Sequence, residues 1–396
     1  MRLSQRVLSM TESSIRKLTP LADAAKGAGK RVYHLNIGQP DLPTPEGFFK
    51  GIRGFEEKVL SYAPSPGLPQ LREVFSQYYQ DRGIDLAPED IVVTNGGSEA
   101  LHFAFTLLCD PGDEILVPEP LYASYLLFAS IASIKLCPVP TRVEDGFHLP
   151  AREEFSRRIT PRTRAILVTN PGNPTGTVYT RAEMEMLADL AREHDLFIIA
   201  DEVYREFVYE GEYLSFMQLP TARDRVLLVD SISKRFSACG ARVGCLAAKN
   251  PLAVKELVKI AQSRLSVATV DQVGAIALAE TPPEYFQEIK EEYRRRRDVA
   301  LEGLQAIPGV FCRCPEGAFY ILARLPVADA EEFAAWLLRD FSLDGATVML
   351  APANGFYVTP GRGKDEVRLA YVLQEEDLRR ALAILKEGLR VYQEGS

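Results

Sequence analysis

Short apolar runs that alternate with helical patterns are the feature that most constrains how this chain can fold. The runs are rich in β-branched residues, and helices are expected between several of them, over residues 100–108, 122–132 and 181–191. Near-continuous apolar strands of this kind are typical of a parallel sheet that is buried on both faces. We therefore predict an α/β fold with a mostly parallel sheet and helices on both of its faces. The predicted strands are residues 91–94, 115–117, 135–138, 164–169, 196–200 and 226–229.

The pattern changes in the last third of the chain. A long charged helix is expected over residues 282–304, followed by short strands within 310–324 and 347–372 and by helices over 331–341 and 375–392. This mixture predicts a second, smaller α+β domain. We divide the chain into an N-terminal arm with part of the small domain (1–45), a large domain (46–285) and a small C-terminal domain (286–396). A helix over residues 48–59 opens the large domain.

Charge and composition disfavour several functional classes. The formal net charge of −8 argues against a general binder of nucleic acids or membrane surfaces. The six cysteines and four histidines show neither zinc-ligand spacing nor a disulfide framework, so we expect no metal site and reduced thiols in a cytoplasmic protein. No apolar run approaches the length of a membrane span, and the N-terminus lacks a signal-peptide core.

Candidate binding residues follow four of the predicted strands within a few positions. They are Gly97 with Ser98, Asn173, Asp201, and the segment from Ser231 to Lys234. In open α/β sheets, ligands bind beyond the carboxyl ends of the strands. We therefore expect these residues to converge on one site.

The segment from Ser231 to Gly244 contains Lys234, and its neighbours could lower the lysine pKa and bind a phosphate group. A free lysine with a pKa of about 10.4 is protonated at neutral pH, and a nearby cation lowers that pKa. The hydroxyl of Ser231, the guanidinium of Arg242 and the glycine-rich turn around Gly97–Glu99 could together bind a phosphate group. A basic loop after a core strand is the alternative interpretation of Lys234 when it is considered alone.

An aldehyde cofactor with a phosphate and a pyridine ring would use all of these groups. Lys234 would hold the aldehyde as a Schiff base, and Asp201 would pair with the ring nitrogen and make the ring an electron sink. Asn173 and Tyr204 would donate hydrogen bonds to the phenolate oxygen, and Tyr122 could stack on the ring.

The motifs, taken in order, resemble the class I/II aminotransferases, which are pyridoxal-phosphate enzymes of fold type I, from end to end. The matching segments are N-I-G-Q-P-D (36–41), Y-A-P-S-P-G-L-P-Q-L-R (62–72), G-G-S-E-A (96–100), N-P-G-N-P-T-G (170–176), D-E-V-Y (201–204), S-I-S-K (231–234), G-A-R-V-G (240–244) and V-R-L-A-Y (367–371). One departure is Gln39, where many relatives carry an acid.

The resemblance implies roles for the matching residues. Lys234 is the Schiff-base lysine and carries the proton between the substrate and the cofactor, with Asp201 and Tyr204 as its catalytic partners. Arg368 clamps the substrate α-carboxylate, because its planar fork suits a carboxylate. The family is typically dimeric, so a homodimer with shared sites is expected. The residues expected to bind the cofactor are Gly97, Ser98, Glu99, Tyr122, Asn173, Asp201, Tyr204, Ser231, Lys234, Arg242 and Tyr62 of the partner subunit, and Gly38 and Asn173 assist in binding the substrate.

The substrate is the least determined part of the expectation. Our preferred reaction moves an amino group between aspartate and 2-oxoglutarate. Dicarboxylic members of the family that the chain resembles often use a second arginine from the partner subunit, so Arg264 is the hypothetical ligand of the distal carboxylate, although a structural or solvent-facing role for Arg264 is also open. An aminotransferase for alanine or aromatic amino acids is an alternative. A C–S β-lyase of the same fold would share nearly every motif. A regulatory domain without turnover would normally carry a DNA-binding module, and none is recognisable in the sequence.

Overall fold

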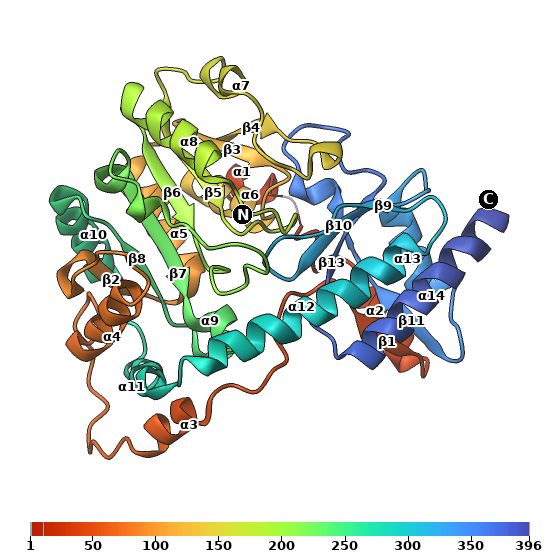
Figure 1. Ribbon diagram of the computed structural model, residues 1–396, viewed down its shortest axis with the longest axis horizontal. Coiled ribbons are helices and arrows are strands. Elements are labelled where there is room, and N and C mark those ends of the chain that lie inside the picture. Colours follow the sequence, from red (N-terminus) through yellow and green to blue (C-terminus); the bar gives the residue numbers. More distant parts are fainter. Residues whose placement is uncertain (1, 11, 396) are drawn as a thin grey trace.

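A seven-stranded sheet forms the centre of the larger part of the chain, as the computed structural model shows for residues 2–10 and 12–395 (Figure 1). All strands run parallel except β8, which is antiparallel to both of its neighbours. The predicted α/β fold is confirmed, but β8 was missed because it is short and follows a glycine-rich motif. The strand order is β2 (Ile91–Thr94), β8 (Gly244–Ala247), β7 (Val226–Ser231), β6 (Phe197–Asp201), β5 (Thr163–Thr169), β3 (Glu114–Glu119) and β4 (Lys135–Pro140).

The helices cover both faces of this sheet, which explains why its strands are almost continuously apolar. Successive strand residues point to opposite faces: Ile198 packs into one core and Ile199 into the other. One core contains residues of α3 (Glu46–Arg53), α4 (Pro69–Gln80), α8 (Arg181–Glu193) and α11 (Thr269–Ala277). The opposite core contains residues of α5 (Gly96–Leu108), α6 (Ser124–Ala132) and α10 (Pro251–Ser263).

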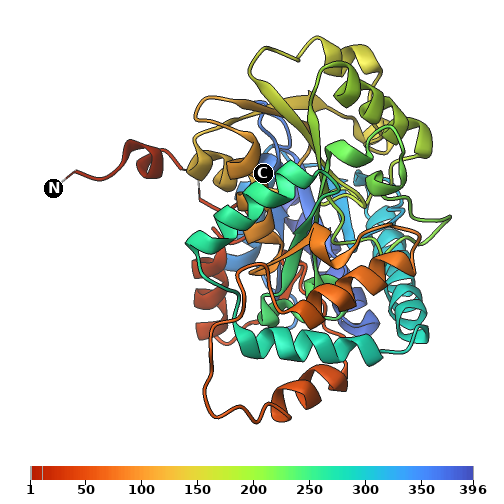
Figure 2. The same ribbon diagram turned by 90° about the vertical axis from the view of Figure 1, so that its left-hand side faces the viewer.

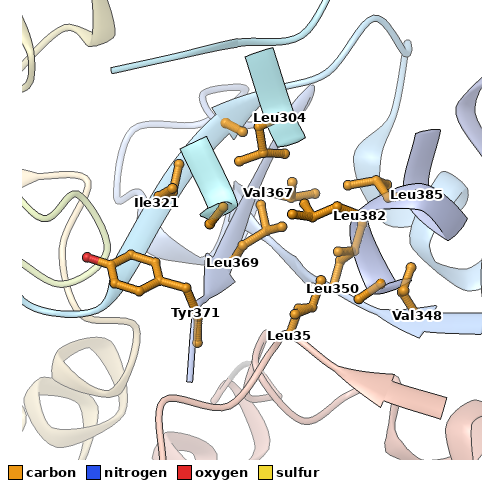
Figure 3. Packing of buried hydrophobic residues seen from close by; sticks show 14 of the residues in the cluster. Leu35, Leu304, Ile321, Val348, Leu350, Val367, Leu369, Tyr371, Leu382 and Leu385 are labelled. Carbon is orange, nitrogen blue, oxygen red and sulfur yellow. The ribbon is translucent and has the colours of Figure 1, made fainter. Parts of the chain in front are cut away.

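A smaller α+β unit packs beside the seven-stranded sheet and has its own core (Figures 1 and 3). Its four-stranded antiparallel sheet has the order β12 (Ala351–Pro352), β13 (Glu366–Ala370), β10 (Tyr320–Arg324) and β9 (Phe311–Cys312). The N-terminal β1 (Arg31–His34) pairs in parallel with β11 (Ala346–Met349), so the N-terminal segment joins this unit. The domain limits at residues 45 and 285 stay a prediction. The helices of the unit are α2 (Thr19–Gly27), α12 (Glu284–Gln305), α13 (Ala330–Arg339) and α14 (Glu375–Glu394).

Two helices differ most from their predicted bounds. The helix expected over residues 48–59 is wrong at its end, because α3 ends at Arg53 and the exposed loop that follows begins at Gly54. The glycine-rich turn after β2 is already helical, since α5 begins at Gly96. The remaining α-helices are short: α1 (Gln5–Leu8), which projects from the side of the molecule near α6 (Figure 2), α7 (Arg152–Ser156) and α9 (Ile232–Arg235). None of the described helices has the length and apolar character needed to cross a membrane.

Candidate active site

A cavity of about 690 Å³ lies at the carboxyl ends of the parallel strands, where the smaller unit meets the large sheet. We call it the strand-end cavity. The structure brings most of the predicted site residues to its wall, and leaves Glu99, Tyr62 and Arg264 off it. The predicted residues that line it are Gly38, Gly97, Ser98, Tyr122, Asn173, Asp201, Tyr204, Ser231, Lys234, Arg242 and Arg368.

Strand register explains why residues so distant in sequence meet here. Thr169 at the end of β5 lies opposite Asp201 of β6, and Asp201 lies opposite Val229 of β7. On the other side, Ser231 of β7 lies opposite Gly244 of β8. Neighbouring strands therefore end at about the same level, and the residues that follow them share one edge of the sheet.

Lys234 and Arg235 are adjacent in sequence, but their side chains lie in different surroundings. Ser231 caps the short helix α9, because its hydroxyl accepts a hydrogen bond from the Ser233 amide at 3.1 Å. Lys234 lines the cavity, and its Nζ donates to the carbonyl oxygen of Gly38 at 2.8 Å. The Arg235 guanidinium is buried and donates to Oδ2 of Asp230 at 2.7 Å. The helix therefore presents only one of its two cations to the cavity.

Asp201 is a buried carboxylate with one oxygen hydrogen-bonded and the other without a hydrogen-bond partner among the described residues. Oδ2 accepts a hydrogen bond from the Tyr125 hydroxyl at 2.6 Å, and the Tyr122 ring packs edge-on against Tyr125. Oδ1 is buried and has no hydrogen-bond partner among the residues that the structure describes. Burial raises the pKa of Asp201 to about 6. A cationic donor placed beside Oδ1 would satisfy this atom and lower the pKa of the carboxyl group again.

The opposite part of the cavity gathers groups that suit an anion. Gly96 has a φ of +73°, and a Cβ atom there would lie 2.4 Å from a terminal nitrogen of Arg242, so only glycine permits this approach. Gly97 and Ser98 lie in the first turn of α5, where backbone amides lack helical partners. The hydroxyls of Ser231 and Ser233 lie 2.7 Å apart on the same wall. These donors and Arg242 form a site suited to a phosphate group.

Arg368 contributes a buried cation from the smaller unit. It is 1% exposed, and its guanidinium donates to Oδ1 of Asn173 at 3.0 Å and to the carbonyl oxygen of Asn36. Its Nε has no hydrogen-bond partner, and no carboxylate of the described residues forms an ion pair with it. A buried cation left in this state favours an anion brought by a ligand.

Tyr320 is a residue of the cavity wall that the sequence did not identify. Its hydroxyl lies 2.9 Å from the hydroxyl of Tyr204, and its ring lies under the guanidinium of Arg368, with 4.5 Å between the guanidinium carbon and the ring centre. Gly38 must lack a side chain here, since a Cβ atom would lie 1.9 Å from the Tyr320 hydroxyl oxygen. An aromatic residue at the start of a strand is common in protein cores, so its sequence position carried no functional signal.

Three predicted residues lie elsewhere. Arg264 donates to Oε2 of Glu99 at 3.0 Å and to backbone carbonyl oxygens, including that of Val93 at 2.7 Å. Both residues therefore tie α5 to neighbouring segments within this subunit, and their roles toward a ligand stay predictions. Tyr62 is 80% exposed in the loop after α3 and is not part of this subunit's cavity.

The similarity of the whole chain to known proteins agrees with this geometry. The family model for aminotransferases of class I and II matches residues 30–385. The chain belongs to this family. The aminotransferase is 35% identical to the aspartate/prephenate aminotransferase of Thermus thermophilus, over 96% of this chain and 97% of the relative. It is 31% identical to the aspartate aminotransferase of Pyrococcus horikoshii, over 98% and 97% of the two chains.

Solved structures also resemble the aminotransferase over nearly its whole length. The Thermus thermophilus aspartate aminotransferase with maleate superposes with a TM-score of 0.88 and 34% identity, over 98% of this chain and all of the other. The alanine aminotransferase of Pyrococcus furiosus superposes with a TM-score of 0.90 and 32% identity, over the same shares. The aminotransferase thus has fold type I and depends on pyridoxal phosphate. The unpartnered oxygen of Asp201 and the anion site around Arg242 both fit this cofactor.

Proposed function

We propose that this aminotransferase transfers the amino group of aspartate to 2-oxoglutarate in the strand-end cavity. The observation that carries the proposal is the buried guanidinium of Arg368, which has no carboxylate partner among the described residues and lies beside Asn173 on the same wall as Lys234. Every α-amino acid and 2-oxo acid brings a carboxylate beside the reacting carbon, and that group would complete this arrangement. Aspartate as the donor is supported by the names of the relatives.

We assign the residues that hold pyridoxal phosphate by their chemistry. Arg242, the hydroxyls of Ser231 and Ser233 and the α5 amides at Gly97 and Ser98 would bind the phosphate. Oδ1 of Asp201 would accept the proton of the ring nitrogen, and Tyr122 would cover the ring. Asn173 and Tyr204 would donate to the phenolic oxygen. Burial raises the pKa of Tyr204 far above its usual value, so its hydroxyl keeps the proton that it donates.

The bound cofactor supplies an electron sink for the negative charge that develops at the substrate α-carbon. Lys234 carries out the proton transfers. Its Nζ takes the proton from the α-carbon of the amino donor, and in the second half of the reaction it returns a proton to the α-carbon of the acceptor. Arg368 and Asn173 hold the substrate carboxylate, which orients the bond to the α-hydrogen toward Lys234. Tyr204 and Tyr320 connect these two groups of residues by hydroxyl contact.

The assembly that we propose is a homodimer in the cytoplasm. The exposed loop after α3 carries Val59, Leu60 and Tyr62, which are 71%, 63% and 80% exposed. Apolar side chains at this exposure in one loop favour a protein interface, and Tyr62 of the partner subunit would then complete the phosphate site. A cytoplasmic location is supported by the six cysteines, which are all free thiols.

The test is a panel of amino donors on the purified holoenzyme. Aspartate, alanine and tyrosine are compared with 2-oxoglutarate as the acceptor, and release of pyruvate and ammonia from cystathionine is measured in parallel. We expect keto-acid formation with the highest kcat/KM for aspartate. Faster release of pyruvate from cystathionine would instead establish a C–S lyase, and a higher kcat/KM for alanine or tyrosine would establish the alternative of an aminotransferase for alanine or aromatic amino acids.

A further inference from the structure

The charged residues of the strand-end cavity leave one cation without a role. Its wall contains four cationic residues and a single carboxylate, Asp201, although the whole chain has a net charge of −8. Three of the cations have proposed tasks: Lys234 in proton transfer, Arg242 at the phosphate and Arg368 at the α-carboxylate. The fourth is Arg16, which belongs to the segment before α2.

Contacts of the two neighbouring residues hold the segment around Arg16 in place, whereas the Arg16 guanidinium is bound to none of the described residues. The carbonyl oxygen of Ile15 accepts a hydrogen bond from Nδ2 of Asn36 at 2.8 Å. Lys17 forms an ion pair with Glu331 of α13. The guanidinium of Arg16 is exposed and has no hydrogen-bond or ion-pair partner among the residues that the structure describes. The segment therefore holds an available cation at the cavity.

Asn36 links this cation to the site of the α-carboxylate. Its side-chain amide holds the carbonyl of Ile15, and its own carbonyl oxygen accepts a hydrogen bond from Arg368. One buried residue thus sets the positions of both the Arg16 segment and Arg368. A ligand with two carboxylates could bind both guanidinium groups, whereas a ligand with one would engage only Arg368.

We propose that Arg16 binds the side-chain carboxylate of the substrate and makes this site selective for amino acids and oxo acids that carry a second carboxylate. The inference rests on the proposed aminotransferase reaction and deepens it by naming the residue that selects its dicarboxylic substrates. It also replaces Arg264 as the distal ligand within one subunit, because the Arg264 guanidinium is already bound to Glu99 and to backbone carbonyls. Ile15, Ile37 and Phe128 on the same wall offer apolar contacts to the carbon chain of such a substrate.

The kinetic test compares aspartate with alanine in variants of Arg16. Arg16→Met keeps the length of the side chain and removes its charge, and Arg16→Lys keeps the charge. We expect Arg16→Met to lower kcat/KM for aspartate by about 10- to 100-fold, the size of a lost charge-assisted hydrogen bond, with alanine changed by less than about 2-fold. Arg16→Lys should recover part of the loss. The control is Arg192→Met, an exposed arginine of α8 that pairs with Asp189 outside the cavity.

A binding test separates this inference from the reaction itself. Succinate and butyrate have the same carbon count but two carboxylates and one, and neither is an amino donor. We expect the wild-type holoenzyme to bind succinate more tightly by calorimetry, and Arg16→Met to reduce the affinity for succinate but not for butyrate. Equal affinities in the wild type, or a loss of succinate binding in Arg264→Met and not in Arg16→Met, would overturn the inference. Failure of the proposed function would appear separately, as absent transamination by the wild-type enzyme.

Discussion

The hydroxyl groups of Tyr204 and Tyr320 lie 2.9 Å apart and join the large sheet to the smaller unit inside the cavity. Nδ2 of Asn173 also donates to the Tyr204 hydroxyl, at 3.4 Å, and the ring of Tyr320 lies under Arg368. The groups proposed to contact the cofactor and those proposed to contact the substrate are thus physically connected through two tyrosines. We regard Tyr320 as a positioning residue for both sets.

Substitution of Tyr320 separates its hydroxyl from its ring. Tyr320→Phe removes one buried hydrogen bond and keeps the surface under Arg368, so we expect kcat to fall by about 3- to 10-fold with little change in KM. Tyr320→Leu also removes the ring, and KM for amino acids should rise in addition. Steady-state kinetics of both variants test this split. Equal changes of KM in the two variants would argue against the proposed role of the ring.

The pKa of Asp201 predicts a pH dependence of the protein without its cofactor. Burial raises this pKa from 3.8 to about 6, so the folded state binds more protons than the unfolded state between these values. The stability of the cofactor-free protein should therefore fall as pH rises from about 4 to 6, by up to about 3 kcal/mol from this residue.

Asp201→Asn removes this titration. We expect the cofactor-free variant to be more stable than the cofactor-free wild type at pH 7.5, with a smaller difference at pH 5, and to bind pyridoxal phosphate more weakly. Urea denaturation at the two pH values and a cofactor titration measure both effects. A stability difference that is the same at both pH values would contradict the assignment.

Asp230 supports the site from inside the core. Its Oδ2 contacts Arg235 at 2.7 Å, Arg205 at 3.3 Å and the Tyr79 hydroxyl at 2.8 Å, and all four residues are buried. Burial raises the pKa of Asp230, but the guanidinium groups of Arg235 and Arg205 more than offset this effect, so the pKa lies below its usual value.

Neutralising Asp230 leaves the buried guanidinium of Arg235 without an ion-pair partner among the described residues, whereas Arg205 keeps Glu202. We expect Asp230→Asn to destabilise the protein by about 3–5 kcal/mol, because a broken buried ion pair leaves an uncompensated charge. The matched control is Asp85→Asn, whose partner Arg223 is at the surface, with an expected loss of less than about 1 kcal/mol. The free energy of unfolding in urea compares the two variants. Equal losses would show that the buried network does not stabilise the fold as proposed.

The strand ends are the part of the site that the sequence pattern predicts. Buried parallel strands leave a continuous apolar pattern, and the rule that ligands bind beyond their carboxyl ends predicts that Asn173, Asp201 and Lys234 lie together. The convergence of these residues at one cavity follows from the strand register. The antiparallel β8 escapes prediction because four residues that begin at the end of a glycine-rich motif carry little periodic signal.

Residues that reach the cavity by tertiary packing cannot be predicted in this way. Arg16 lies in a segment without a regular pattern, and its place is set by the contact between Ile15 and Asn36. Arg264 is a different case. Its sequence position suggests a substrate ligand, which stays a prediction, and only the folded chain reveals that its guanidinium contacts Glu99.

The attachment of the cofactor to Lys234 tests the central claim most directly. The holoenzyme is reduced with borohydride, digested and examined by peptide mass spectrometry, and the Lys234→Ala variant is assayed for transamination beside it. We predict a pyridoxyl group on Lys234 and a loss of transamination of at least about 100-fold in the variant, the lower range of a lost general base. A pyridoxyl group on another lysine, or full transamination by Lys234→Ala, would contradict the account.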